Sequence, residues 1–311
     1  MGREISEVER YIRANVTLAP YTTFRIGGPA QFFAQPETLD DFKAVFEWAI
    51  KKKLPYFLMG GGSNLLVHDD GFRGLIIHTG KLNRTSVDGT TIRAECGVLI
   101  DSLVDLSQKY MLSGLEFAAG LPGSVGGALF MNARAYEGEF SSVVRSVHAL
   151  KVEKSRVREE HLKGEELGFS YKKSIFQERK LYIYSVLFKL KRGEAPLITM
   201  KIDDIRKKRV KAGQYIFPNA GCIFKNNYDI GRPAGMIIDE LGLKGKRIGG
   251  AEVYQKHANF IINRGGATAR DVYDLMVYIE REVFRKTGIR LEREINLLGE
   301  WGSQKITQKI I

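Results

Sequence analysis

The stretch that decides the fold is "LPYFLMGGGSNLLV", Leu54 to Val67, where an apolar strand runs into three glycines. The G-x-G-x-x-G fingerprint of the common dinucleotide-binding fold must follow a strand and open a helix. Here a second strand follows, and Leu65 stands where the third glycine belongs. The sequence also has no G-x-x-x-x-G-K-[ST] loop. Backbone N–H groups of successive glycines can form an anion-binding nest. The stretch is therefore either a phosphate loop of another kind or only a tight turn.

A second glycine-rich passage, "GLPGSVGGALFMNARA" from Gly120 to Ala135, favours the phosphate interpretation. It places Ser124 beside glycines, just before a helix start expected at Val125–Ala128. Helix N-termini and free backbone amides bind phosphate oxygens. Two such loops suit a ligand with two phosphates, so they indicate a dinucleotide held without the usual fold.

The composition is that of a soluble globular protein with two or three lobes. Of the 311 residues, 44% are hydrophobic and 27% are charged. We find neither the apolar run of a signal peptide nor one long enough to span a bilayer. Two cysteines, Cys96 and Cys222, make no disulfide framework, so we expect a reducing cytoplasm. The five histidines form no pair with metal-type spacing, so we expect no metal site.

The formal charge of +12 requires an explanation. The densest basic run, "RKKRVK" from Arg206 to Lys211, is either a solvated helix face or a region that attracts anionic small molecules. A nucleic-acid-binding protein is a third possibility, although the sequence has no recognisable reader motif or series of stacking aromatics.

Helix and strand signals alternate along the chain. Thr38 with Asp41, and Thr268 with Asp271, predict capped helix starts, and Gly288 is placed to end the last long helix. The segment "IRLEREINLLG", which follows that glycine, predicts a strand. We place the main domain boundary near residues 194–196.

Six motifs then occur in order from Tyr21 to Trp301: "YTTFRIGGPA", "MGGGSNLLV", "GLEFAAGLPGSVGGALFMNARAYEGE", "FSYKKSIF", "NAGCIFKN" and "LEREINLLGEW". Together they resemble the UDP-N-acetylenolpyruvoylglucosamine reductases, flavoenzymes of peptidoglycan precursor synthesis, in their shorter subtype. The resemblance implies an α+β fold. The implied fold consists of a two-lobed FAD-binding region of the vanillyl-alcohol oxidase (PCMH) type over residues 1–195, a substrate-binding α+β lobe over 196–302, and a tail over 303–311.

The resemblance also implies FAD as cofactor, with NADPH as the hydride donor. No histidine stands within the loops concerned, so we expect FAD without a covalent tether. The residues expected to contact FAD are Arg25, Gly60, Gly61, Gly62, Ser63, Asn64, Pro122, Gly123, Ser124, Gly126 and Tyr171.

Three residues match the catalytic positions of the family. Lys172 stands where the family usually has arginine and would stabilise an enolate, with Lys173 as the alternative. Cys222 stands where many relatives have the proton-donating serine, and Glu294 matches a carboxyl group that assists enolate formation. The implied substrate contacts are Lys211, Lys225, Asn226 and Gln255.

The implied activity is the NADPH-dependent reduction of UDP-N-acetyl-enolpyruvylglucosamine to UDP-N-acetylmuramate. The alternative is another flavin oxidase or dehydrogenase of the same fold, acting on a sugar or an alcohol. We expect a cytoplasmic monomer that binds a small-molecule substrate and neither nucleic acid nor membrane.

Overall fold

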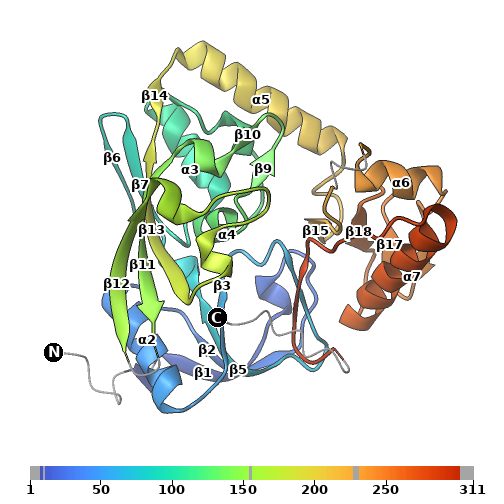
Figure 1. The fold of residues 1–311 in the computed structure, drawn as a ribbon, viewed down its shortest axis with the longest axis horizontal. Helices are drawn as coiled ribbons and strands as arrows, with labels where there is room; N and C mark the ends of the chain where they lie inside the picture. Colours follow the sequence, from blue (N-terminus) through green and yellow to red (C-terminus); the bar gives the residue numbers. More distant parts are fainter. Residues whose placement is uncertain (1–7, 10, 154–155, 227–230, 302–311) are drawn as a thin grey trace.

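The computed structural model describes residues 8–9, 11–153, 156–226 and 231–301. Three lobes are visible, with the third set apart from the first two and joined to them across the top by helix α5 (Figure 1). The expected tail, residues 303–311, lies outside the described residues. No helix among the described residues has the length and apolar character needed to cross a bilayer.

The first lobe is a four-stranded sheet with one helix. In spatial order its strands are β1 (Ile12–Thr17), β2 (Pro29–Ala34), β5 (Phe72–His78) and β3 (Tyr56–Met59). β2, β5 and β3 are parallel, and β1 is antiparallel to β2. Helix α2 (Leu39–Lys51) begins with the predicted capping box of Thr38 and Asp41. Its apolar face, with Phe42 and Phe46, shares a core with the second lobe.

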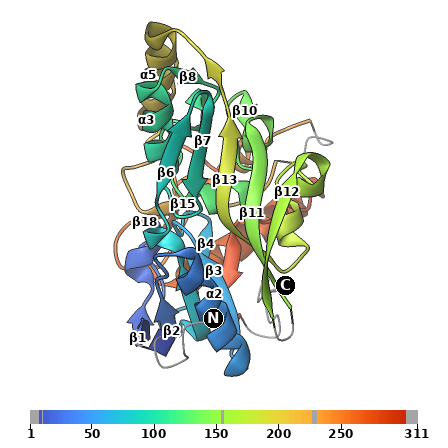
Figure 2. The ribbon, with the colours of Figure 1, turned by 90° about the vertical axis from the view of Figure 1, so that its left-hand side faces the viewer.

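The second lobe is an antiparallel sheet, seen face on in Figure 2, with helices α3 (Ile100–Lys109) and α4 (Val125–Phe130) on one side (Figure 1). In spatial order its strands are β12 (Val157–Lys163), β11 (Val144–Val152), β13 (Leu181–Lys189), β7 (Thr91–Glu95) and β6 (Thr85–Asp88). The charged strand β12, "VREEHLK", has no apolar alternation, so sequence patterns did not predict it. The short strands around this lobe are β8 (Leu112–Ser113), β9 (Arg134–Ala135), β10 (Gly138–Glu139) and β14 (Lys191–Arg192).

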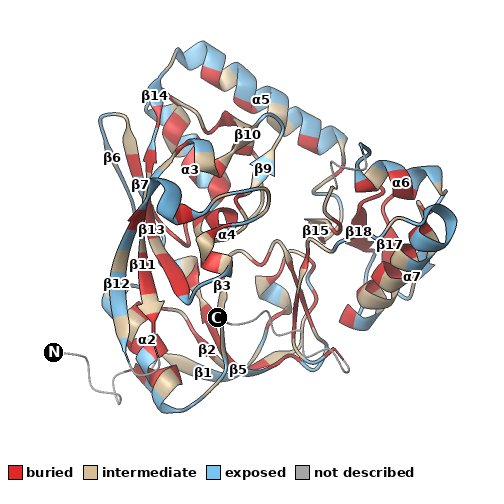
Figure 3. Cartoon of the chain, in the orientation of Figure 1, coloured by how far each residue is buried: buried red, intermediate tan, exposed pale blue. Residues whose placement is uncertain are grey.

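The third lobe packs helices α6 (Ala234–Glu240) and α7 (Ala269–Thr287) on a small antiparallel sheet. In spatial order its strands are β15 (Asn219–Cys222), β18 (Phe260–Asn263), β17 (Ala251–Val253) and β16 (Arg247–Ile248). Thr268 and Asp271 form the predicted capping box of α7, and Gly288 ends the helix in the left-handed region, at φ 73°. Buried residues run along the inner side of α7 (Figure 3).

Helix α5 (Ala195–Lys211) packs against the first two lobes. Its buried residues Ile198 and Ile202 join the core that the first two lobes share. The boundary expected near 195 therefore coincides with the start of a helix whose apolar face belongs to the FAD-binding region rather than to the third lobe.

The strand predicted over Ile289–Gly299 is mostly wrong. Only β19 (Asn296–Leu298) forms, parallel to β4 (Leu65–Val67) of the first lobe. Before it, Arg293 makes one isolated bridge with Phe224 and pairs with Glu280 of α7, at 2.5 Å between Nε and Oε1. The backbone of this segment also pairs with residues 223–225, where N–H of Lys225 donates to the carbonyl of Glu292 and N–H of Glu294 donates to that of Ile223, both at 2.8 Å, but the pairing is too short to form a strand.

Candidate active site

A cavity of about 840 Å³ opens where the three lobes meet. The first lobe contributes the loop Gly60–Asn64, and the second contributes Leu121–Ser124 and Tyr171–Lys172. The third contributes Ala220–Cys222 and the connection Arg293–Asn296. Most of the predicted site residues line this one space, although their segments are far apart in the chain.

The two glycine loops, which we call the phosphate wall (Gly60–Asn64 and Pro122–Ser124), touch each other. A Cβ atom on Gly61 would lie 2.8 Å from Cα of Gly123, and one on Gly123, at φ +116°, would lie 2.6 Å from Oγ of Ser63. Real Cβ atoms do not come so close to backbone. Glycine is therefore required here, first of all so that the two loops can approach one another.

The phosphate wall also offers unused hydrogen-bond donors. Within the described part of the chain, the N–H groups of Gly61, Gly62, Ser63, Gly123 and Ser124 donate no hydrogen bond. The side chain of Ser124 accepts from N–H of Gly127 and caps α4. Buried backbone donors are almost always paired, so donors gathered in this way are fitted to an anion with several oxygens, such as the pyrophosphate of FAD.

A second cavity of about 490 Å³ lies on the other side of the phosphate wall and shares Gly60, Gly61 and Ser124 with the first. His78 lies on its border, where Nδ1 is 3.2 Å from Nε2 of Gln35. Burial, and then the positive charge of Arg13, lower the pKa of His78 to about 4. The imidazole is therefore neutral at pH 7.

Lys172 and Glu294 form an ion pair at the first cavity, with 2.5 Å between Nζ and Oε1 and 14% of each side chain exposed. The backbone of Lys172 is left-handed, at φ 57°, which is uncommon for a residue other than glycine. Nε2 of Gln177 donates to its carbonyl at 2.9 Å and fixes the turn. Lys173 is exposed and does not line the cavity, so the geometry favours Lys172 over its neighbour.

Cys222 lies beside this ion pair, at the end of β15. Burial, and then the negative charge of Glu294, raise the pKa of its thiol to about 12, while Lys172 and a hydrogen bond with Asn259 act in the opposite direction. The thiol is therefore protonated at neutral pH. We call Lys172, Cys222 and Glu294 the reaction wall.

Lys225 pairs with a carboxylate rather than with the thiol. Its Nζ lies 2.5 Å from Oε1 of Glu292, whose side chain is 73% exposed. In a regular strand Glu292 and Glu294 would share one face, but the segment is not a strand there, and the two carboxylates contact different lysines. Asn226 lines the cavity, and its Oδ1 accepts from N–H of Ala234 at the start of α6.

Asn64 joins the two walls. Its Nδ2 donates to the carbonyl of Glu294 at 3.1 Å, and its own carbonyl accepts from N–H of Asn296 at 3.1 Å. The last residue of the first glycine loop thus holds the backbone that carries the Glu294 carboxylate.

Three predicted residues lie away from the cavity lining: Arg25, Lys211 and Gln255. All three are exposed. Arg25 is exposed because its neighbours are buried. Phe24 and Ile26 point into the core of the third lobe, and this turns the side chain of Arg25 outward. The motif "TFRIGG" therefore packs the first lobe against the third.

Arg209 was missed by sequence reasoning. It lies within the basic run of α5, but it is 7% exposed and lines the first cavity. Its Nε donates to the carbonyl of Ala119 at 2.8 Å, and one terminal nitrogen is buried without a hydrogen-bond partner in the described residues. The signal was present, since Arg209 continues the helical spacing of the buried Ile198 and Ile202.

Comparison with known proteins fits this arrangement. Residues 30–158 match the FAD binding domain family, and residues 212–298 match the C-terminal domain of UDP-N-acetylenolpyruvoylglucosamine reductase. The reductase of that name from Latilactobacillus sakei subsp. sakei (strain 23K) is 38% identical over 304 residues, which cover 95% of this chain and 99% of that protein. The one from Carboxydothermus hydrogenoformans is 41% identical over 92% of this chain and 93% of its own length.

A solved structure agrees. The crystal structure of UDP-N-acetylenolpyruvylglucosamine reductase from Thermus caldophilus superposes with a TM-score of 0.79 and 34% identity, over 93% of this chain and 100% of that one. These findings confirm the expected fold class, FAD as the cofactor with NADPH as its hydride donor, and an oxidoreductase activity. The chain belongs to the UDP-N-acetylenolpyruvoylglucosamine reductase family.

Proposed function

We propose that the protein reduces UDP-N-acetyl-enolpyruvylglucosamine to UDP-N-acetylmuramate with NADPH, a step of peptidoglycan precursor synthesis. The observation that carries the proposal is the convergence of an acid, a cation and a carboxyl group on the cavity that the phosphate wall borders. An enol ether that gains a hydride needs a cation for the negative charge that develops and a donor for the final proton.

We assign the FAD pyrophosphate to the phosphate wall, because its unpaired N–H groups match the oxygens of a diphosphate. Gly126 and Tyr171 complete the expected cofactor set, and both line the first cavity. The second cavity, on the far side of the same glycines, then has room for the adenosine end. FAD held by the phosphate wall, Gly126 and Tyr171 would supply the hydride chemistry that links NADPH to the substrate.

Lys172 stabilises the enolate that the hydride addition leaves on the enolpyruvyl group. A fixed ammonium does this better than water, because it needs no reorganisation as the charge develops. Glu294, whose Oε1 lies 2.5 Å from Nζ of Lys172, assists by holding that ammonium in place beside the developing charge. Cys222 then gives its proton to the carbanionic carbon and completes the reduction.

Lys225 and Asn226 lie at the same cavity and are placed to contact the sugar nucleotide. Lys211 and Gln255 remain proposals with weaker support, because they are exposed outside the cavity lining. We also propose a monomeric, cytoplasmic protein, for which sedimentation velocity and cell fractionation are the direct measurements.

The deciding experiment is anaerobic. The holoenzyme is reduced with NADPH, the enolpyruvyl sugar nucleotide is added, and flavin absorbance and product formation are followed. Rapid reoxidation with formation of the muramate product is expected. A reduced enzyme that ignores this substrate but reacts quickly with oxygen would instead support the alternative, a flavin oxidase of the same fold.

A further inference from the structure

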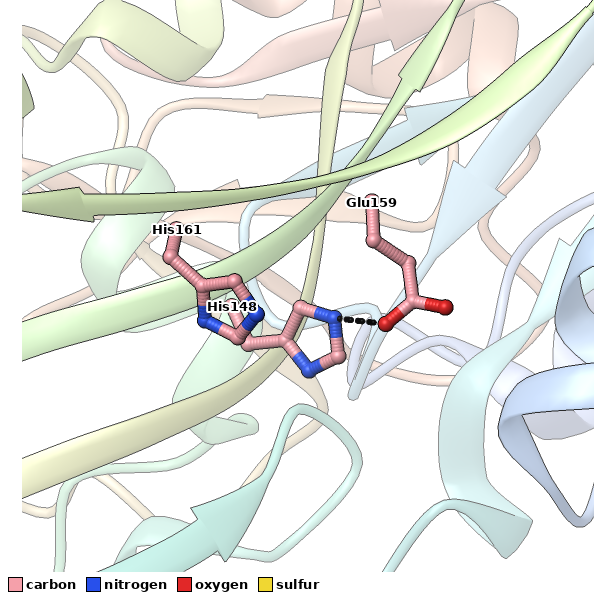
Figure 4. A group of neighbouring side chains, drawn as sticks. All are labelled: His148, Glu159 and His161. Carbon is pink, nitrogen blue, oxygen red and sulfur yellow. Dashed lines mark ion pairs between the residues drawn. The ribbon is translucent and has the colours of Figure 1, made fainter.

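Two histidines and a glutamate gather on the second lobe beside α2 (Figure 4), and none of the three lines either cavity. His148 lies on β11 and faces His161 on β12 across the antiparallel register. Glu159 is two positions before His161, so both point to the same side of the strand. The histidines are distant in sequence, which is why their spacing gave no indication of a metal site.

The potential ligand atoms of the three side chains lie within 4.8 Å of one another. Nε2 of His148 is 2.8 Å from a carboxylate oxygen of Glu159, and the side chain of His148 is 11% exposed. That nitrogen is buried but does not have the alignment of a hydrogen bond. A cation bound to both groups would give this buried nitrogen the partner that it lacks by hydrogen-bond alignment among the described residues.

We propose that His148, His161 and Glu159 bind a divalent first-row transition-metal ion, with Zn²⁺ as the representative ion. Two imidazoles and one carboxylate form a ligand set that suits Zn²⁺ and its neighbours better than Mg²⁺ or Ca²⁺, which prefer oxygen ligands. Three protein ligands leave the remaining coordination positions to water. The ion has no part in the proposed reduction and serves to hold the two strands.

One ring has to turn when the ion binds. The two imidazoles are stacked, with ring centres 4.2 Å apart and 17° between their planes. Two ligands at about 2.1 Å from one ion are at most about 4.2 Å apart. The ligand atoms here lie within 4.8 Å of one another, so a small rotation of one ring is enough to bring them to an ion. His161 is exposed and has space to rotate.

Lys43 of α2 competes for the same carboxylate. Its ammonium group contacts Glu159, so an incoming ion replaces one positive charge by another. Removing the ammonium without removing a ligand should therefore tighten metal binding. This expectation distinguishes a metal site from a cluster whose members merely pack together.

The test is calorimetric titration of the tag-free holoenzyme with ZnCl₂ at pH 7.5, with Co²⁺ absorption as a report on coordination. Wild type should bind one ion, and Glu159→Gln and His161→Gln should each weaken binding at least about tenfold. Lys43→Gln should tighten it about two- to fivefold. Zn²⁺ should also raise the melting temperature of wild type.

The matched control is Glu160→Gln. Glu160 is adjacent to Glu159 but points to the opposite side of β12 and pairs with Lys151, so its loss should leave Zn²⁺ affinity unchanged. The variants replace exposed or half-buried side chains and should fold. Absence of Zn²⁺ binding in wild type, or unchanged affinity in the double variant Glu159→Gln, His161→Gln, would overturn the proposal.

Discussion

The phosphate wall and the reaction wall face the same cavity but are built from different parts of the chain. The first presents backbone N–H groups, and half of its residues are glycines. The second consists of three side chains from three separate segments. Cofactor binding in this protein therefore depends on glycines, whose missing Cβ atoms leave backbone N–H groups accessible. The reaction depends instead on the chemical groups of particular side chains.

The largest effect should come from Cys222→Ala on the reaction wall. Loss of the proton donor should slow product formation by about 100- to 10,000-fold, whereas FAD content and reduction by NADPH stay normal. Single-turnover reoxidation of the reduced enzyme by the enolpyruvyl substrate measures this step. Cys222→Ser, which keeps a donor of similar size, should retain substantial activity. Near-normal turnover of the alanine variant would reduce Cys222 to a packing residue.

Lys172→Ala should have the next largest effect, on the same half-reaction. A single contact to a developing oxyanion contributes about 2.7–4 kcal/mol, or about 100- to 1000-fold in rate. Lys173→Ala is the matched control, because it removes the same charge from an exposed neighbour and should change the rate by only a few-fold. Lys172→Arg, which restores the usual family residue, should remain active. Equal losses in the two alanine variants would contradict this assignment.

His78 allows a test on the other side of the phosphate wall, by acid stability. Its pKa is about 4 in the folded protein and about 6.5 when unfolded, so the unfolded state binds more protons between these values. Above about pH 6.5 the titration of His78 does not lower the free energy of unfolding. As the pH falls towards 4, this free energy decreases by up to about 3 kcal/mol, because protons bind His78 in the unfolded state first. Urea unfolding of the apoprotein at several pH values measures it. His78→Gln should flatten this part of the profile, and an unchanged slope would show that His78 titrates normally.

The smallest effect should be on FAD affinity in Gly123→Ala. A methyl group there meets Oγ of Ser63 and strains a left-handed backbone, so we expect FAD binding weaker by at least about tenfold, or about 1.4 kcal/mol. Gly168→Ala is the control, since it has a positive φ as well but only ordinary contacts and lies outside both cavities. Equal FAD affinity in both variants would show that this loop does not bind the cofactor.

The sequence predicted local structure best where one short pattern determines it. The capping boxes of α2 and α7 need only two residues each, and both form as predicted. Strand β12 was not predicted because its charged sequence has no apolar alternation, and the His148–His161 pair was missed with it, since only the register of β11 and β12 brings the two histidines together. The connection before β19 depends on contacts with distant segments, such as that of Arg293 with Glu280 of α7. The burial of Arg209 did have a local signal, the helical spacing from Ile198 and Ile202, but the charge of the run concealed it.

Asn64 couples the phosphate wall to the reaction wall. It lies at the end of the loop assigned to the FAD pyrophosphate, and its side chain holds the carbonyl of Glu294. When FAD orders this loop, the loop therefore also orders Glu294. Coupling between two binding sites is reciprocal, so a substrate that orders Glu294 should in turn tighten the binding of FAD. Hydrogen exchange at residues 293–296, which line the same cavity and contact Asn64, should slow when FAD binds. The enzyme would then acquire its catalytic geometry only after it has acquired its cofactor.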